Sequence, residues 1–383
     1  MRAISYGRQD ISPEDIQVVI EALGDDFLTQ GPRILQFEEK FADYVEAKYA
    51  VAVSNGTAAL HLAAMALNVS ASSNVITSPI TFVASANCIK YCGGKITFAD
   101  IDPKTFTLDI EAVRKLLEES PKGTYDGIIP VDFAGYACNL EEFKALAEEY
   151  GLWIIEDACH APGGYFIDSK KKKQKCGNGA FADLAIFSFH PVKHIAAGEG
   201  GMITTNDKAL YERLLSLRTH GITKEPSKLI ENHGLWYHEM HELGYNYRLT
   251  DFQAALATSQ LRRADEGLKR RHEIAQRYES AFKGTAVKTA EVASDVYHAY
   301  HLYLVELNNR KKVYDELRKH KIFTQVHYIP VHTQPFYRNL ESKRLVFPVA
   351  ETYYAKTLSL PMFPSLTDEE QDFVITKILE VAE

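Results

Sequence analysis

Three short segments of the sequence contain residue types that bind phosphate, hold a proton or attack a carbonyl carbon. Residues 54–60 read Ser-Asn-Gly-Thr-Ala-Ala-Leu, a glycine turn followed by a helical run. The N–H groups at such a helix start are free to bind an anion. Residues 153–160, Trp-Ile-Ile-Glu-Asp-Ala-Cys-His, place two acids after an apolar run. Residues 187–193, Phe-Ser-Phe-His-Pro-Val-Lys, place a serine and a lone lysine after another apolar run.

Each segment taken alone has an ordinary interpretation, as a helix N-cap or as a solvated loop. Taken together, they offer a phosphate cradle, a buried acid that can pair with a pyridinium nitrogen, and a lysine that can form an imine. These are the parts that the chemistry of pyridoxal 5'-phosphate (PLP) requires. The combination therefore favours a PLP enzyme.

The other motifs predict no competing chemistry. Residues 177–182 fit a dinucleotide-binding glycine pattern, but they follow a lysine run at 170–173 and lead into a strand. We interpret them as a turn and the lysine run as a hairpin tip, which disfavours a dinucleotide-binding oxidoreductase. His238 and His241 lack the spacing of a zinc helix, and Cys88 and Cys92 have no second cysteine pair. We predict no metal site.

Composition excludes several classes of protein. The chain has 383 residues, which predicts two domains. Its net charge of −8 disfavours a nucleic-acid-binding protein. No apolar run reaches the roughly 18–20 residues of a membrane helix, and the first residues have no signal-peptide core. The five cysteines are scattered, so a disulfide framework is not expected. We expect a soluble cytoplasmic protein.

The elements that must position these residues alternate between strands and helices. Short apolar runs at 51–53, 75–77, 96–98, 128–131 and 153–155 are separated by helical patterns at 56–67, 84–91, 110–117 and 140–150. This alternation predicts an α/β fold with a mainly parallel sheet between helix layers. Ligands of such sheets bind at the carboxyl ends of the strands.

After about residue 245 the pattern predicts a small α+β domain. It has a long helical stretch over 250–282, strands at 301–305 and 323–328, and a helix at 311–319. Thr367 and Glu370 form a capping box for a last helix. We predict a large PLP-binding domain over 1–245, which includes an N-terminal substrate-loop segment, and a small C-terminal domain over 246–383.

The order and spacing of these motifs resemble the fold-type I PLP enzymes, and more narrowly the DegT-type nucleotide-sugar aminotransferases. The resemblance covers nearly the whole chain, with matching segments at 27–32, 81–84, 218–221, 244–250 and 325–332. The stretches at 189–193 and 327–330 are most similar to those of the transaminases of pseudaminic acid biosynthesis. The resemblance implies a large domain with a mainly parallel seven-stranded sheet between helices, and a small C-terminal α+β domain.

The resemblance also implies roles for individual residues. Lys193 corresponds to the lysine that carries the cofactor and moves a proton during catalysis. Asp157 corresponds to the partner of the pyridine nitrogen, Phe82 to the aromatic residue stacked on the ring, and His160 to a residue near the 3-hydroxyl. The remaining cofactor-binding residues implied are Gly56, Thr57, Ala58 and Ser188 for the phosphate, and Asn246 for the phosphate of a neighbouring subunit. The substrate-binding residues implied are Tyr6, Leu28, Thr29, Arg248, Gln325, His327 and Tyr328.

The implied activity is PLP-dependent transfer of an amino group to C4 of a UDP-4-keto-6-deoxy-N-acetylhexosamine. L-glutamate is the implied donor, pyridoxamine phosphate (PMP) the implied intermediate, and a homodimer with shared active sites the implied assembly. Two alternatives stay open. One is a 4-aminotransferase for another UDP- or dTDP-linked keto sugar. The other is a PLP-binding regulatory protein without turnover, which Lys193 disfavours because a chain without catalysis does not need the lysine.

Overall fold

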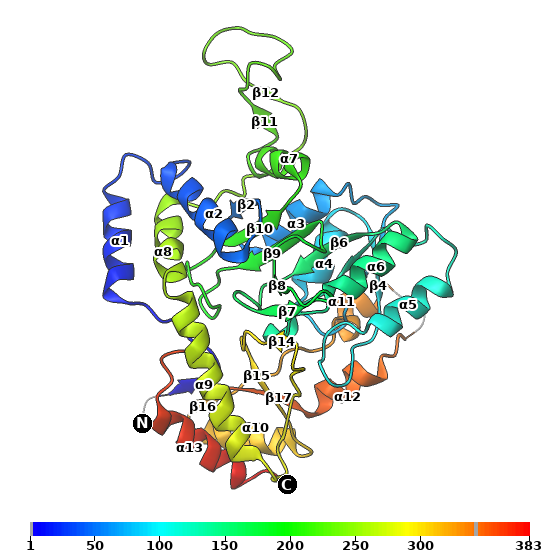
Figure 1. Ribbon diagram of the computed structural model, residues 1–383, viewed down its shortest axis with the longest axis vertical. Coiled ribbons are helices and arrows are strands. Elements are labelled where there is room, and N and C mark those ends of the chain that lie inside the picture. The colour runs from blue at the N-terminus through cyan, green and yellow to red at the C-terminus, as the bar shows by residue number, and fades with distance from the viewer. Residues whose placement is uncertain (1–2, 341–343) are drawn as a thin grey trace.

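A seven-stranded sheet forms the centre of the molecule (Figure 1). The computed structural model describes residues 3–340 and 344–383. The strand order is β2-β10-β9-β6-β5-β3-β4, and only β10 runs antiparallel to its neighbours. The strands are β2 (Tyr49–Val53), β3 (Asn74–Thr77), β4 (Lys95–Phe98), β5 (Gly127–Ile129), β6 (Trp153–Asp157), β9 (Leu184–Ser188) and β10 (Gly201–Thr205). The predicted mainly parallel sheet of seven strands is confirmed.

Helices cover both faces of this sheet because its strands are apolar on both faces. Alternate residues of β2 belong to separate buried clusters, Ala50 and Ala52 to one and Val51 and Val53 to the other. The helices of this part are α1 (Pro13–Leu23), α2 (Pro32–Val45), α3 (Gly56–Ala66), α4 (Ala84–Tyr91), α5 (Ile110–Glu118), α6 (Leu140–Tyr150), α7 (Lys208–Arg218) and α8 (Asp251–Leu261). The predicted helices at 84–91 and 140–150 match α4 and α6 at both ends.

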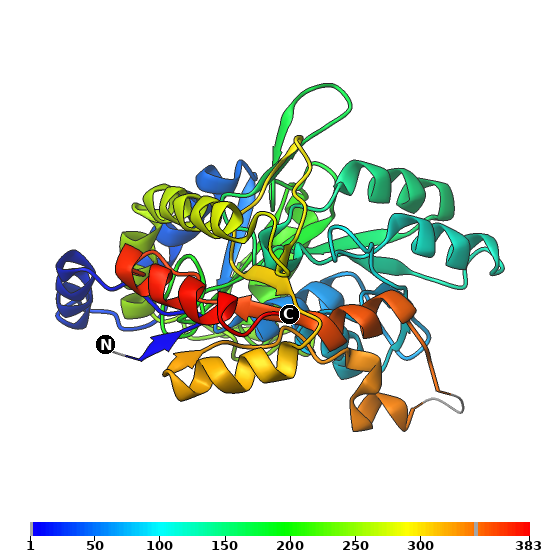
Figure 2. The ribbon, with the colours of Figure 1, turned by 90° about the horizontal axis from the view of Figure 1, so that it is seen from below.

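The C-terminal part contains a three-stranded antiparallel sheet of β13 (Lys288–Thr289), β15 (Tyr303–Glu306) and β17 (Thr357–Leu360). Its helices are α9 (Ala264–Phe282), α10 (Arg310–Lys319), α11 (Pro335–Arg338), α12 (Pro348–Lys356) and α13 (Asp368–Leu379), and α13 lies against α9 and α10 (Figure 2). The capping box at Thr367 is present, with both of its hydrogen bonds to Glu370. The division of the chain at residue 245 stays a prediction.

Two expectations for this part are wrong. The helical stretch over 250–282 is two helices, because α8 ends at Leu261 and packs on α1 and α2, whereas α9 begins at Ala264. The strand expected at 323–328 is only β16 (Ile322–Phe323), which pairs in parallel with β1 (Ile4–Ser5). Beyond it the chain makes a single bridge from Gln325 to Ser359, and His327 and Tyr328 then line a cavity instead of continuing a strand.

Smaller strands form two hairpins. The lysine run lies at the tip between β7 (Tyr165–Ile167) and β8 (Lys173–Lys175). Strand β7 also pairs with β14 (Val296–Tyr297), which completes a second small sheet. The glycine pattern that follows is a turn before β9, as predicted, with Gly177 and Gly179 at positive φ. A projecting arm, residues 222–240, carries β11 (Ile222–Thr223) and β12 (Glu239–Met240) away from the body (Figure 1).

In the described part of the chain, no helix has the length and apolar character needed to cross a membrane.

Candidate active site

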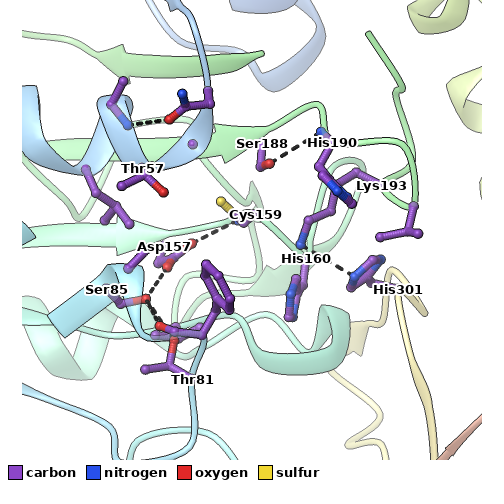
Figure 3. Close-up of a pocket in the computed structure, with 18 of the residues that line it drawn as sticks. Thr57, Thr81, Ser85, Asp157, Cys159, His160, Ser188, His190, Lys193 and His301 are labelled. Carbon is purple, nitrogen blue, oxygen red and sulfur yellow. Dashed lines mark hydrogen bonds between the residues drawn. The ribbon is translucent and has the colours of Figure 1, made fainter. Parts of the chain in front are cut away.

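The three segments singled out in the sequence meet at one cavity of about 660 Å³ (Figure 3). They follow the carboxyl ends of β2, β6 and β9, which are near neighbours in the sheet order. The cavity is lined by Gly56 and Thr57 from the first segment, Asp157 from the second and Lys193 from the third. The parallel sheet therefore gathers residues that lie more than 130 positions apart in the chain.

The start of α3 forms the cradle at one end of the cavity. Asn55 caps the helix, and its side-chain oxygen accepts the N–H of Ala58 at 2.8 Å. Since first-turn N–H groups have no acceptor within a helix, those of Gly56 and Thr57 are the donors this turn offers to an anion. A Cβ on Gly56 would lie 2.9 Å from Ser188 Cβ. Glycine thus lets the helix start approach the end of β9, where the Ser188 hydroxyl also lines the cavity.

Asp157 is the last residue of β6, and its carboxylate is almost completely buried. One carboxylate oxygen, Oδ1, accepts the backbone N–H of Cys159 at 3.2 Å. The other, Oδ2, accepts the hydroxyl of Ser85 at 2.6 Å (Figure 3). A buried carboxylate held in this way keeps a fixed orientation toward the cavity and can accept one further hydrogen bond.

Lys193 lies on the loop after β9, and its amine points into the cavity (Figure 3). Burial lowers the pKa of Lys193, and the nearby Asp157 opposes that change. The Lys193 Nζ lies 3.5 Å from Nε2 of His301. Burial, and then the proximity of Lys193, lower the pKa of His301 well below its usual value. A neutral imidazole beside the amine leaves the lysine free of a competing positive charge, and a larger neutral fraction of the amine favours nucleophilic attack.

His160 is neutral, and its hydrogen bonds fix its tautomer. Its Nδ1 accepts the backbone N–H of Ala134 at 3.2 Å, so the ring proton is on Nε2. Nε2 then donates to the hydroxyl of Tyr328 at 3.2 Å. Burial lowers the pKa of His160 well below its usual value, and Lys193 adds to this effect. His160 and Tyr328 therefore act as one hydrogen-bonded pair at the edge of the cavity.

Aromatic side chains close the other side of the cavity. Phe82 is 56% exposed at its rim, and its ring centroid is 6.1 Å from that of Tyr328. The ring centroids of Tyr6 and His327 are 4.9 Å apart. The pairing of β1 with β16 brings Tyr6 to this place from the far end of the chain. These surfaces suit a flat, partly apolar ligand.

Two predicted substrate residues, Leu28 and Thr29, do not line the cavity of their own chain. Thr29 forms a backbone bridge with Thr250, and the carbonyl of Leu28 accepts the N–H of Asp251. Both lie in the connection between α1 and α2, and Leu28 is half-exposed. The segments around 28 and 250 thus form one stretch of surface.

Three further predicted residues also lie outside the cavity of their own chain. Asn246 is exposed and forms a backbone bridge with Thr219. Arg248 lines a separate hollow of about 320 Å³ beside Arg218. Gln325 is exposed, at its bridge to β17. One chain alone therefore brings together eight of the nine predicted cofactor residues, all except Asn246, and three of the seven predicted substrate residues.

The cavity also contains residues to which the sequence analysis gives no role. They include Thr81, Ser85, Tyr91, His190, Glu199, Tyr247 and His301. Tyr247 lies within the matching segment at 244–250, so its position in the chain could have indicated it. Ser85 is an unremarkable residue on a short helix, and His301 precedes an apolar strand. No local pattern marks either of them.

A second group of titratable side chains lies in the core next to this site. Asp132, Glu156 and Cys176 are buried, and their ligand atoms lie within 4.8 Å of one another. The backbone N–H of Asp132 donates to the carbonyl of Asp157 at 3.0 Å. Burial raises the pKa of Asp132 to about 6 and, together with Asp132, raises that of Glu156 well above its usual value. Burial thus favours the protonated form of these carboxyl groups, whereas a metal ion would favour the deprotonated form.

Comparison with known proteins identifies the fold and the chemistry. The DegT/DnrJ/EryC1/StrS aminotransferase family matches residues 9–379. A UDP-4-amino-4,6-dideoxy-N-acetyl-beta-L-altrosamine transaminase of Campylobacter jejuni is 34% identical over 386 residues, which cover 99% of this chain and 98% of the relative. A GDP-perosamine synthase of Escherichia coli O157:H7 is also 34% identical, over 99% of each chain.

A solved structure shares the architecture over almost the full length. Helicobacter pylori PseC, an aminotransferase involved in the biosynthesis of pseudaminic acid, superposes with a TM-score of 0.89 at 30% identity, covering 99% of each chain. The chain therefore belongs to the DegT/DnrJ/EryC1/StrS aminotransferase family and is a PLP-dependent aminotransferase with the fold-type I architecture.

Proposed function

We propose that this enzyme transfers an amino group from L-glutamate to C4 of a UDP-4-keto-6-deoxy-N-acetylhexosamine, as in pseudaminic acid biosynthesis. The observation that carries the proposal is the cavity in which Lys193 faces Asp157 and the start of α3. The names of the relatives from Campylobacter jejuni and Helicobacter pylori support this substrate class.

The residues of the cavity fit PLP. The N–H groups of Gly56 and Thr57 and the hydroxyl of Ser188 surround the space for the phosphate, and Ala58 shapes the turn while its own N–H is held by Asn55. We assign Asp157 to the ring nitrogen, Phe82 to the ring face and the His160–Tyr328 pair to the 3-hydroxyl. The cofactor supplies the electron sink for the transfer.

Lys193 is the proposed catalytic residue. Its amine is buried, and burial lowers its pKa, so more of it is neutral than in an exposed lysine, and it would hold the cofactor through the aldehyde group. The same Nζ would serve as the base that moves the proton during the transfer. His301, which is 3.5 Å away and neutral, offers that amine a hydrogen-bond acceptor without adding charge.

The proposed sugar-nucleotide site lies where Tyr6, His327 and Tyr328 line the cavity. Nδ1 of His327 is 2.8 Å from the Ser359 hydroxyl, which holds the imidazole against Tyr6. Burial lowers the pKa of His327 to about 3, so this ring is neutral near pH 7 and acts through hydrogen bonding rather than charge. Gln325 is assigned to the outer part of the same site.

We also propose a homodimer with shared active sites, in which Leu28, Thr29, Asn246 and Arg248 act on the partner's site. These residues lie on the surface of one chain, away from its own cavity. Large apolar side chains are exposed on α1, on the connection from α1 to α2 and on the projecting arm: Ile16, Ile20, Leu23, Phe27, Ile230, Leu235 and Trp236. Apolar surface of this extent favours burial against a second copy.

Borohydride trapping tests the cofactor assignment. The protein loaded with PLP should be yellow, with an absorbance maximum at about 410–430 nm typical of a protonated imine, and borohydride should fix the cofactor on Lys193. Lys193→Ala should still bind the cofactor but should not turn over. Label on another lysine would contradict the assignment.

A panel of nucleotide-linked 4-keto-6-deoxy sugars, with L-glutamate as donor and product NMR as readout, tests the substrate. We expect the UDP-linked N-acetylhexosamine to give the highest kcat/KM. A preference for a GDP-linked sugar would move the enzyme toward the chemistry named for the E. coli relative. Cofactor binding without turnover of any sugar would instead support a regulatory protein.

A further inference from the structure

Two buried hydroxyl groups connect α4 and the segment before it to the carboxylate at the end of β6. The Ser85 Oγ lies 2.6 Å from Oδ2 of Asp157 and 2.8 Å from Oγ1 of Thr81 (Figure 3). Thr81 is 2% exposed and Ser85 1% exposed, although atoms of both residues line the wall of the cavity. The three groups thus form a row from the preceding segment to the carboxylate.

The chemistry of the three groups fixes the direction of their protons. The Ser85 hydroxyl has two acceptors within reach, the carbonyl of Phe82 at 3.3 Å and Oδ2 of Asp157 at 2.6 Å. Because a carboxylate only accepts hydrogen bonds, a contact as short as 2.6 Å requires the single proton of Ser85 to lie on the bond to Asp157. The oxygen of Ser85 then has free lone pairs, and the hydroxyl of Thr81 donates to it. Both bonds therefore run toward the carboxylate, and each donor strengthens the next.

We propose that Ser85 and Thr81 are positioning residues, which form a hydrogen-bonded relay that orients Asp157. Asp157 shares a proton with the ring nitrogen of the cofactor, and the relay keeps that proton on the nitrogen. This inference rests on the role of Asp157 proposed above. A carboxylate oxygen that already accepts a short, buried hydrogen bond holds a further proton less strongly. The ring nitrogen then keeps its proton, and the cofactor remains an effective electron sink.

Removal of the relay should weaken this arrangement without removing Asp157. In Ser85→Ala, Oδ2 loses its donor, and the shared proton should shift toward the carboxylate. We expect kcat/KM to fall by about tenfold to a hundredfold, because a hydrogen bond to a charged group has roughly that weight. Thr81→Val keeps the hydroxyl of Ser85 and should cost only a few-fold. Ser85→Thr keeps a hydroxyl and should restore most of the activity.

The decisive measurement is the ring proton itself. Each variant is loaded with PLP that carries 15N in the ring, because the 15N chemical shift separates a protonated from an unprotonated pyridine nitrogen. The resonance should move toward the unprotonated range in Ser85→Ala, less so in Thr81→Val, and not in Ser85→Thr. In the double variant the effect of Thr81→Val should largely vanish, since the relay is already broken.

Ser259→Ala is the matched control, because Ser259 is also buried and lies beside a buried carboxylate, Asp15, far from the cavity. It should leave the 15N resonance unchanged. An unshifted resonance in Ser85→Ala, or an equal shift in Ser259→Ala, would overturn the relay. If Ser85→Ala does not fold, an unshifted 15N resonance in Thr81→Val would likewise overturn the relay. Failure of borohydride to fix PLP on Lys193 in the wild type would instead refute the proposed function.

Discussion

Replacing Asp132 by asparagine is expected to make the stability of the enzyme less sensitive to pH. Asp132 is fully buried beside Glu156, and its Oδ1 accepts the N–H of Cys138 at 2.9 Å. Both carboxylate oxygens of Glu156 accept the N–H of Gly177. Asparagine preserves the shape and the acceptor at residue 132, and its amide can donate to Glu156. The substitution therefore removes a titrating group while it keeps the hydrogen bonds.

The sign and size of the effect follow from the raised pKa. Burial raises the pKa of Asp132 from 3.8 to about 6, so the folded protein binds this proton more tightly than the unfolded chain. The contribution to stability is fully present below pH 3.8 and is lost as the pH rises through 6. The difference between these two pKa values corresponds to about 3 kcal/mol in the free energy of unfolding. For a chain of 383 residues, it corresponds to about 4 °C in Tm.

The assay is thermal unfolding of the PLP-loaded wild type and variant between pH 4.5 and pH 8. Because pH 4.5 already lies above 3.8, about 2 of the 3 kcal/mol are still present at the start of this range, and the wild type should lose about 2–3 °C more than Asp132→Asn over it. The matched control is Asp183→Asn, because Asp183 also accepts a backbone N–H, from Ile154, but is partly exposed. This control should follow the wild type.

Parallel curves for the wild type and Asp132→Asn would refute the interpretation that burial raises the pKa of Asp132 in the folded protein. A metal ion held by Asp132, Glu156 and Cys176 would reverse the trend, because metal ligands must be deprotonated. The wild type would then gain stability as the pH rises, and a chelator would abolish the gain.

Three further predictions concern the active site. Asp157→Asn should fold but lose several kcal/mol of transition-state stabilisation, so kcat should fall by orders of magnitude. A rate near that of the wild type would leave Asp157 only the structural role of holding the turn at Cys159. Gly56→Ala would place a Cβ 2.9 Å from Ser188 Cβ, so the Kd for PLP, measured by fluorescence titration, should rise at least tenfold. An unchanged Kd would show that this turn does not bind the phosphate. Heterodimers of Lys193→Ala with Asn246→Asp should recover about a quarter of wild-type activity at equal amounts of each chain, since half of the dimers then carry one intact site. No recovery in verified heterodimers would contradict a role for Asn246 in the partner's site.

Much of the fold could be predicted from the sequence because its signals are local. The apolar runs that became β2, β3, β4, β5 and β6 are short and alternate with helical patterns, which suits a parallel sheet buried on both faces. The break between α8 and α9 has no such signal. Residues 262 and 263 are arginines that are compatible with a helix, and the break is set by the packing of α8 on α1 and α2. Tertiary contacts therefore determine where α8 ends, and a single sequence does not reveal these contacts.

The same distinction explains which parts of the site the sequence could indicate. Gly56, Asp157 and Lys193 stand at the carboxyl ends of strands, and in a parallel sheet these ends meet at one edge. Knowing the strands is enough to place such residues together. Tyr6 needs a further contact, the parallel pairing of two-residue strands from opposite ends of the chain, which periodicity cannot reveal.

Ser85 and His301 are harder still, because their importance lies in what they touch rather than in what they are. A serine in the first turn of α4 is an ordinary helix residue, and only the 2.6 Å bond to Asp157 gives it a function. His301 comes just before β15 of the C-terminal sheet, yet its ring lies beside Lys193, on the loop that follows β9 of the central sheet. The residues proposed to do the chemistry are thus placed by the sheet, whereas those proposed to adjust its electrostatics come from separate elements. Variation among aminotransferases of this fold is therefore expected to concentrate in the second group, where a change alters the surroundings of Asp157 or Lys193 without displacing them.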